Sequence, residues 1–431
     1  MLGAFVNAFR TPDLRRKMLF VLMVVAIFRF GSQLPSPGVN VLNVRECVDQ
    51  VSNSGVYGLI NLFSGGALLQ LTVFALGIMP YITASIILQL LVVVIPRLET
   101  LKKEGQAGQA KITQYTRYLT LALAILQATG IVALARGGQL LQGCTLPLLY
   151  DDGLGTFLVM VITMTAGTAV IMWLGELITD RGIGNGMSIL IFTQVVATFP
   201  STMWSLQQTK GWAVFTMVIV IGMVIIATVI FMEQGQRRIP VQYARRMVGR
   251  KMYGGSSTYI PLKVNQAGII PVIFASSLLY LPALMTQFDP DASNPITGWV
   301  GAHLVRGDHP FYMALYFGLI VFFTYFYVAI TFNPVEIADN MKKYGGFIPG
   351  IRAGKPTEEY LNYVLSRITL PGALYLGSVA LIPLIALVLV EANANFPFGG
   401  TSILIMVGVA LDTVKQIESQ LQQRNYEGFL R

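Results

Sequence analysis

The stretch that decides the fold is residues 58–91, GLINLFSGGALLQLTVFALGIMPYITASIILQLL. From Phe74 onward it is apolar over about the 20 residues that a membrane-spanning helix needs. The part before Phe74 is equally apolar, but Gly65-Gly66 interrupts it, and glycine weakens a helix. We therefore expect a short, broken apolar segment followed by a true span. On the residues alone, the first segment is either a structural re-entrant turn or a functional element.

The composition places the whole chain in a membrane. Of its 431 residues, 54% are hydrophobic and 12% are charged, whereas soluble domains carry about 25% charged residues. The chain is thus predicted to be an all-α polytopic membrane protein with about ten spans. The apolar runs lie at about residues 18–34, 74–94, 116–135, 154–175, 184–200, 213–232, 267–286, 311–332, 368–390 and 400–419.

The distribution of basic residues fixes an expected orientation. If the N-terminus is cytoplasmic, 25 of the 30 Lys and Arg residues fall on the cytoplasmic side and four on the outer side. Basic residues concentrate in cytoplasmic loops of membrane proteins. The net charge of +9 therefore reflects topology more than a nucleic-acid partner. Both termini are expected to be cytoplasmic.

The spans offer little chemistry for catalysis or ion coupling. Glu176, Glu233 and Asp412 lie toward the predicted cytoplasmic ends, and both histidines lie in an outer loop. Ion-coupled carriers usually keep ionisable groups within their spans. The glycine-rich stretches GQAGQAK and RGIGNGMS lack the spacing of a phosphate-binding loop. We expect no enzymatic activity, no catalytic residue, no metal site and no cofactor.

Isoleucines and cysteines leave alternatives open. Ile82 and Ile86 are four residues apart and share one helix face. Together with isoleucines of other spans they form either ordinary packing or a dry constriction that excludes water. Cys47 and Cys144 show no metal or redox spacing; we expect them to be unpaired apolar fillers, with a disulfide as the alternative.

Several long motifs resemble the SecY family of bacterial protein-conducting channel subunits, in the family's order and over essentially the whole chain. These motifs are FALGIMPYITASIILQLL, KKEGQAGQAKITQYTRYLT, WLGELITDRGIGNGMSI, EQGQRRIPVQYARR, STYIPLKVNQAGIIPVIFASS, FNPVEIADNMKKYGGFIPGIRAGKPTEEYL and FGGTSILI.

The resemblance implies two inverted-topology halves that form an hourglass-shaped pore. Spans one to five would occupy residues 1–200, an outer hinge loop residues 201–212, and spans six to ten residues 213–431. Inverted repeats of this kind are a known membrane architecture. Two cytoplasmic docking loops are expected at about residues 233–266 and 333–367.

The resemblance also gives the broken segment and the isoleucines a place. The segment at about residues 58–72 would be the plug that blocks the closed pore, including Asn61, Phe63, Ser64, Gly65 and Gly66. The apolar pore ring would consist of Ile82, Ile86, Met187, Ile191, Ile273 and Ile405. Met187 stands where the family pattern has isoleucine, and its side chain is more flexible.

A lateral gate toward lipid is implied between spans two and three and spans seven and eight. Gln127, Ser276 and Ser277 are its polar candidates, although interhelical hydrogen bonding would also account for them. Arg245, Arg246, Arg250 and Arg352 would dock the SecA ATPase and the ribosome. Arginine suits the phosphates of ribosomal RNA. Topology and binding of anionic lipids are the alternative roles for these arginines.

The implied function is a channel that passes unfolded secretory polypeptides across the bacterial plasma membrane and releases hydrophobic segments into lipid. Its implied partners are SecE, SecG, SecA, the ribosome, nascent chains and anionic lipids. The alternative is an inverted-repeat secondary transporter for a small solute. A transporter should place polar ligands at mid-membrane, where this chain places isoleucines.

Overall fold

The computed structural model describes residues 11–51, 67–68, 70–137, 146–151, 153–243, 246–248, 251–253, 257–288, 295–305, 309–390 and 400–427. Its helices are α2 (Pro12–Gly31), α3 (Val41–Val51), α5 (Met79–Val94), α6 (Pro96–Lys103), α7 (Gln106–Arg136), α8 (Leu154–Arg181), α9 (Gly186–Gln234), α10 (Ile270–Phe288), α11 (Pro295–Val300), the π-helix η1 (Gly301–Val305), α12 (Pro310–Thr331), α13 (Pro334–Lys343), α14 (Lys355–Val390) and α15 (Gly400–Glu427).

Each of the ten predicted spans overlaps one of these helices. In the described part of the chain, five helices are long and apolar enough to cross a membrane, or six if α5 and α6 count as one broken span. The two helices meet at 100°. Large apolar side chains stand exposed along α8 and α9, as expected of surfaces that face lipid.

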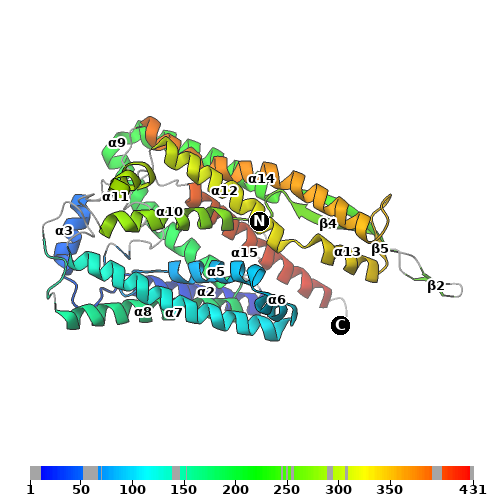
Figure 1. The fold of residues 1–431 in the computed structure, drawn as a ribbon, viewed down its shortest axis with the longest axis horizontal. Coiled ribbons are helices and arrows are strands. Elements are labelled where there is room, and N and C mark those ends of the chain that lie inside the picture. The colour runs from blue at the N-terminus through cyan, green and yellow to red at the C-terminus, as the bar shows by residue number, and fades with distance from the viewer. Residues whose placement is uncertain are drawn as a thin grey trace.

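The helices form two groups that lie side by side along the long axis (Figure 1). One group contains α2, α5, α7 and α8, and the other contains α10, α12 and α14. The helices α9 and α15 pack against each other and join the two groups. The division of the chain into halves at residues 1–200 and 213–431 stays a prediction, and α9 runs across that boundary.

The predicted hinge loop takes a different form from the one expected. Residues 201–210 are helical, and α9 continues to Gln234 with a single break at Gly211, where φ is 78° and ψ is 178°. Positive φ is readily adopted by glycine, so the turn between the two halves of α9 is concentrated at this residue. The role of the segment as a hinge stays a prediction.

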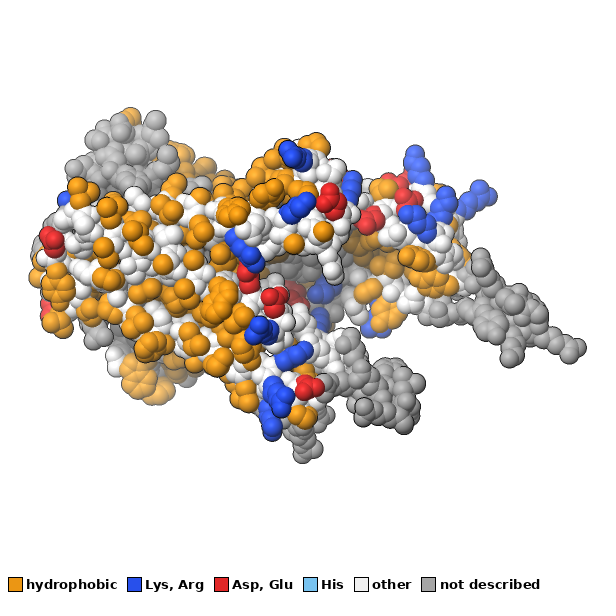
Figure 2. Space-filling model, turned by 90° about the horizontal axis from the view of Figure 1, so that it is seen from below, with side chains coloured by type: hydrophobic (Ala, Val, Ile, Leu, Met, Phe, Trp, Pro, Cys, Tyr) orange, Lys and Arg blue, Asp and Glu red, His pale blue; other side chains and the backbone are white. Residues whose placement is uncertain are grey.

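A small sheet lies at one end of the molecule. Strand β1 (Gln236–Tyr243) pairs antiparallel with β4 (Ser257–Lys263) along one edge and with β5 (Gly346–Phe347) along the other. A separate hairpin, β2 (Arg246–Val248) with β3 (Lys251–Tyr253), projects beyond it (Figure 1). Charged side chains gather toward this end, and hydrophobic ones cover most of the rest of the face in view (Figure 2).

Candidate functional site

An apolar cluster joins α2 and α8 to α9 and α15. We call it the central cluster. Its buried members are Val24, Phe28, Phe74, Ile78, Ile171, Leu174, Ile178, Ile189, Leu190, Val195, Ile405 and Val409. Phe28 and Phe74 stack with ring centroids 5.9 Å apart. Helices α2, α8, α9 and α15 therefore share one buried apolar contact region.

The central cluster brings together four of the six predicted ring residues. Ile405 is 1% exposed and belongs to its core. Ile82, Met187 and Ile191 are half-buried and pack against it from α5 and α9. Ile86 and Ile273 are half-buried and lie outside the cluster. The six side chains thus come from four helices, but only four of them are assembled in one cluster.

An asparagine N-cap, Asn185, begins α9 two residues before Met187. The Asn185 side-chain oxygen accepts hydrogen bonds from the amides of Met187, at 3.1 Å, and Ser188, at 3.4 Å. An asparagine N-cap of this kind supplies partners for amides that have none inside the helix. The orientation of the first turn, and therefore of Met187, is set by this cap.

Glycines bring α8 and α9 into backbone contact beside Met187. A Cβ on Gly186 would lie 1.8 Å from the Gly175 carbonyl oxygen, and a Cβ on Gly175 would lie 2.4 Å from Met187 Sδ. Thr179 Oγ1 donates to the Gly175 carbonyl at 3.0 Å and accepts from the Gly186 amide at 2.9 Å. The α8–α9 contact therefore packs directly against Met187, one of the predicted ring residues.

The predicted plug residues Asn61, Phe63, Ser64, Gly65 and Gly66 lie outside the described residues. The segment that follows is anchored. A β-bridge joins Pro35 to Thr72, and the Ser36 amide donates to the Leu71 carbonyl at 3.0 Å. Leu71 is fully buried with φ of 49°, a left-handed conformation that costs a non-glycine residue about 1–2 kcal/mol.

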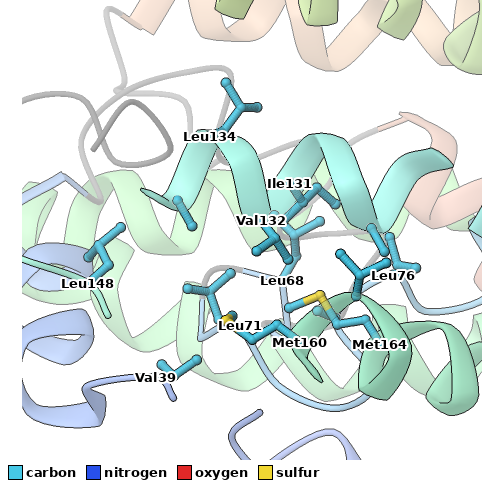
Figure 3. Packing of buried hydrophobic residues seen from close by; sticks show 14 of the residues in the cluster. Val39, Leu68, Leu71, Leu76, Ile131, Val132, Leu134, Leu148, Met160 and Met164 are labelled. Atoms are coloured by element: carbon cyan, nitrogen blue, oxygen red, sulfur yellow. The ribbon is translucent and has the colours of Figure 1, made fainter. Parts of the chain in front are cut away.

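Leu68 and Leu71 point into a second apolar cluster, between α7 and α8 (Figure 3). The labelled partners in that view are Val39, Leu76, Ile131, Val132, Leu134, Leu148, Met160 and Met164. Burial against two spans offsets the strained backbone at Leu71. The trailing end of the predicted plug is thus fixed to the first half of the molecule.

The two helix pairs of the predicted lateral gate pack within themselves rather than against each other. Helix α5 packs on α7, and α10 packs on α12, but in the described part of the chain neither α5 nor α7 packs extensively on α10 or α12. Gln127 is half-buried on α7. Ser276 Oγ donates to the Ile273 carbonyl at 3.0 Å. Ser277 lies on α10, and its side chain is outside the described part.

The two predicted docking loops fold into one unit: β1, β4, β5, α13 and the first turns of α14. We call it the cytoplasmic unit after its expected orientation. The pairing of β5 with β1 joins the second loop to the first. Its apolar core contains Ile239, Val241, Leu262, Met341, Ile348, Leu361 and Val364. A shared core makes the two loops a single folded platform.

The arginines predicted to dock partners are only partly described. Arg245 and Arg250 lie outside the described residues, and Arg246 begins β2. Arg352 is exposed in the turn before α14, where its carbonyl accepts from buried Thr357 Oγ1 at 2.8 Å. This bond fixes the backbone that presents the guanidinium.

The cytoplasmic unit carries several exposed basic residues besides Arg352 that the motifs did not single out. They are Arg237, Arg238, Lys342, Lys343 and Lys355. The Arg238 guanidinium stacks over the Tyr259 ring at 4.9 Å. The motifs QRRIPVQYARR and KKYGGFIPGIRAGK contain most of these residues, but only the sheet shows that the two motifs share one surface.

A charge pair between two spans was also missed. Arg117 on α7 donates from Nε to Glu176 Oε1 and from Nη2 to Glu176 Oε2, both at 2.8 Å. The two residues are 59 positions apart, so no local pattern in the sequence indicates the pair.

The expectation that both cysteines are unpaired is wrong. Cys47 is disulfide-bonded and fully buried on α3. Cys144, the other cysteine of the chain, lies outside the described residues. In the described part of the chain no three His, Cys, Asp or Glu side chains are grouped as a metal site would need.

Comparison with known proteins places this architecture in a family. The SecY family model matches residues 72–414. The protein translocase subunit SecY of Streptomyces galbus is 66% identical over 438 residues, covering 100% of both chains.

Solved structures show the same fold at lower identity. A protein-conducting channel covers 94% of this chain and 91% of its own, with a TM-score of 0.61 and 18% identity. A SecY structure, described as one whose plug domain stabilises the closed state, has the same coverage, a TM-score of 0.59 and 20% identity. The chain belongs to the SecY family.

Proposed function

We propose that this chain is the pore-forming subunit of a Sec protein-conducting channel. Unfolded secretory polypeptides pass between its two halves, and hydrophobic segments leave sideways into lipid. The central cluster carries this proposal, because it assembles Ile82, Met187, Ile191 and Ile405 from both halves. Apolar side chains close a path to ions, which would have to shed water, and offer a passing chain no fixed polar partner.

The plug and the lateral gate complete the proposal. The plug includes Asn61, Phe63, Ser64, Gly65 and Gly66. Its trailing end is anchored on α7 and α8, which supports a hinged blocker that stays attached to one half. The sparse packing of α5 and α7 against α10 and α12 supports a seam there that opens to lipid. Gln127, Ser276 and Ser277 lie on the helices that flank this seam.

The cytoplasmic unit is proposed to dock the SecA ATPase and the ribosome. Arg352 and its exposed basic neighbours stand on a rigid platform, which suits a partner that pushes or a polyanionic ribosomal surface. We further propose SecE and SecG as partner subunits, anionic lipids at the basic loops, and a bacterial plasma-membrane location with cytoplasmic termini.

Arg352 gives this proposal a direct test in vesicles that contain the chain with its partner subunits. Arg352→Glu should abolish ATP-driven import of a secretory protein, while membrane insertion and abundance of the chain stay near wild type. Lys111→Glu, an exposed charge reversal on α7 outside the cytoplasmic unit, is the matched control and should transport normally. Normal import by Arg352→Glu would contradict the docking role. Absence of import by the wild-type chain would contradict the channel itself.

A further inference from the structure

The pair formed by Arg117 and Glu176 is held by more contacts than an ordinary surface ion pair. Both carboxylate oxygens accept a hydrogen bond from the guanidinium, at 2.8 Å each. Arg117 Nη1 also donates to Gln114 Oε1 at 3.2 Å, on the same helix. A two-point contact fixes orientation as well as distance. The Glu176 side chain is 22% exposed and the Arg117 side chain 41%, so the pair is reached by water mainly from the arginine side.

Glu176 follows directly after the residue at which α8 touches α9. Gly175 lies against the Gly186 backbone and Met187 Sδ, and Thr179 bridges the Gly175 carbonyl and the Gly186 amide. A displacement of Glu176 therefore moves the backbone that supports Met187. The ion pair connects α7 to the support of the ring.

The α7 end of the pair belongs to the proposed lateral gate. Gln127 lies ten residues beyond Arg117 on the same uninterrupted helix, or about 15 Å along it. Helix α7 is also fixed at its start, because a Cβ on Gly108 would lie 1.7 Å from the Leu101 carbonyl oxygen of α6. Movement of α7 relative to α8 must break both charge-assisted hydrogen bonds of the pair.

Few other polar groups act on this pair. Asp180, one turn beyond Glu176 on α8, and Tyr81 on α5 interact electrostatically with Arg117. Neither Asp180 nor Tyr81 makes a hydrogen bond to Arg117 in the described part of the chain, whereas Glu176 accepts two. Charge-assisted hydrogen bonds are stronger than neutral ones, so the two bonds of this pair favour the arrangement that keeps α7 and α8 together at this point.

We propose that Arg117 and Glu176 are positioning residues that couple the gate helix α7 to the ring segment of α9 through α8, and that their pairing stabilises the closed channel. This inference rests on the proposed ring and gate. It adds a specific polar connection between them: beside the apolar cluster that α7 and α8 share, the ion pair links the gate helix to the backbone that contacts Met187.

The test uses the assembled channel in planar bilayers and in vesicles. Glu176→Gln keeps the shape of the side chain but removes its charge. We expect it to raise resting ion conductance about five-fold or more, and to raise import of a secretory protein that lacks its signal. The exchange Arg117→Glu with Glu176→Arg should restore both values. Glu99→Gln is the control, because it removes an exposed pair with Lys103 of 2.7 Å, and it should change nothing.

The outcomes separate this inference from the proposed function. Wild-type resting conductance in a folded Glu176→Gln channel would overturn the inference, as would an exchange variant that behaves no better than either single variant. Equal loss of signal-dependent import and of abundance would show a purely structural role and would also overturn it. A wild-type channel that imports nothing would instead contradict the proposed function.

Discussion

Two glycines, Gly175 and Gly186, set how closely α8 and α9 approach beside Met187, a residue of the proposed ring. Gly186 faces the Gly175 carbonyl, which is backbone and has no freedom to move aside. Gly175 faces Met187 Sδ, the far part of a flexible side chain. An added methyl group therefore has to displace backbone at Gly186 but only a flexible side chain at Gly175.

We predict that Gly186→Ala destabilises the channel far more than Gly175→Ala. The added methyl at Gly186 forces α8 and α9 apart, and overpacking costs about 1–3 kcal/mol or more. At Gly175 the methyl displaces Met187 at a cost near the lower end of that range. Thermal unfolding of the purified complex in detergent measures both variants. Equal unfolding temperatures would contradict the backbone contact.

The cap of α9 gives a second prediction at this scale. Asn185→Ala should cost about 0.5–2 kcal/mol of stability and should also raise resting ion conductance, because the first turn of α9 carries Met187. Asn333 caps α13 in the same way, with hydrogen bonds of 3.2 and 3.5 Å from Val335 and Glu336. Asn333→Ala should lose similar stability without leakage. Leakage from both variants would mean that the cap does not position the ring.

Among the elements, the cytoplasmic unit shows most clearly what tertiary structure adds to the sequence. In the sequence the two basic loops are separate motifs, and neither motif indicates that their apolar residues share a core. Pairing of β1 with β5 gives them one core. The unit therefore moves as a body, and a defect in its core affects both loops together.

Leu262→Ala tests this unity. Leu262 is fully buried in β4, and removing a buried leucine side chain costs about 2–5 kcal/mol. We expect protease sensitivity in residues of both loops and a loss of SecA-driven import. Val335→Ala, at a position on α13 that is 47% exposed, should change neither. Cleavage confined to the first loop would show that the loops are independent.

Prediction from sequence succeeded where the signal was local. Each of the ten hydrophobic runs falls on a helix of the described chain, two of them on α9, because span length is imposed by the bilayer. The helical course of residues 201–210 was missed, since its polar Gln-Gln-Thr-Lys stretch resembles a loop. The Arg117–Glu176 pair and the β1–β5 pairing escaped prediction because each joins residues that are far apart in the chain. The disulfide at Cys47 was missed because spacing gives no information about pairing.

Over the whole molecule, the helices meet at two boundaries that differ in packing: the central cluster and the proposed seam. The two groups of helices are joined at the central cluster, through α9 and α15. Along the proposed seam, α5 and α7 on one side pack only sparsely against α10 and α12 on the other in the described part of the chain. A channel that conducts along its axis and opens to lipid needs both properties: a tight apolar constriction and a weakly packed side.

The most direct test of this account is to ask which residues a polypeptide touches in transit. A photoreactive amino acid would replace Ile191 or Ile405 in the assembled channel, so that the disulfide at Cys47 stays intact. A secretory protein would be stalled midway, and adducts would be counted. Matched probes at Val196, exposed on the same helix, and Ile162, exposed on α8, serve as controls. The account predicts adducts at Ile191 and Ile405 and few at the controls. Equal adducts at all four positions, or none at the ring while transport continues, would contradict it.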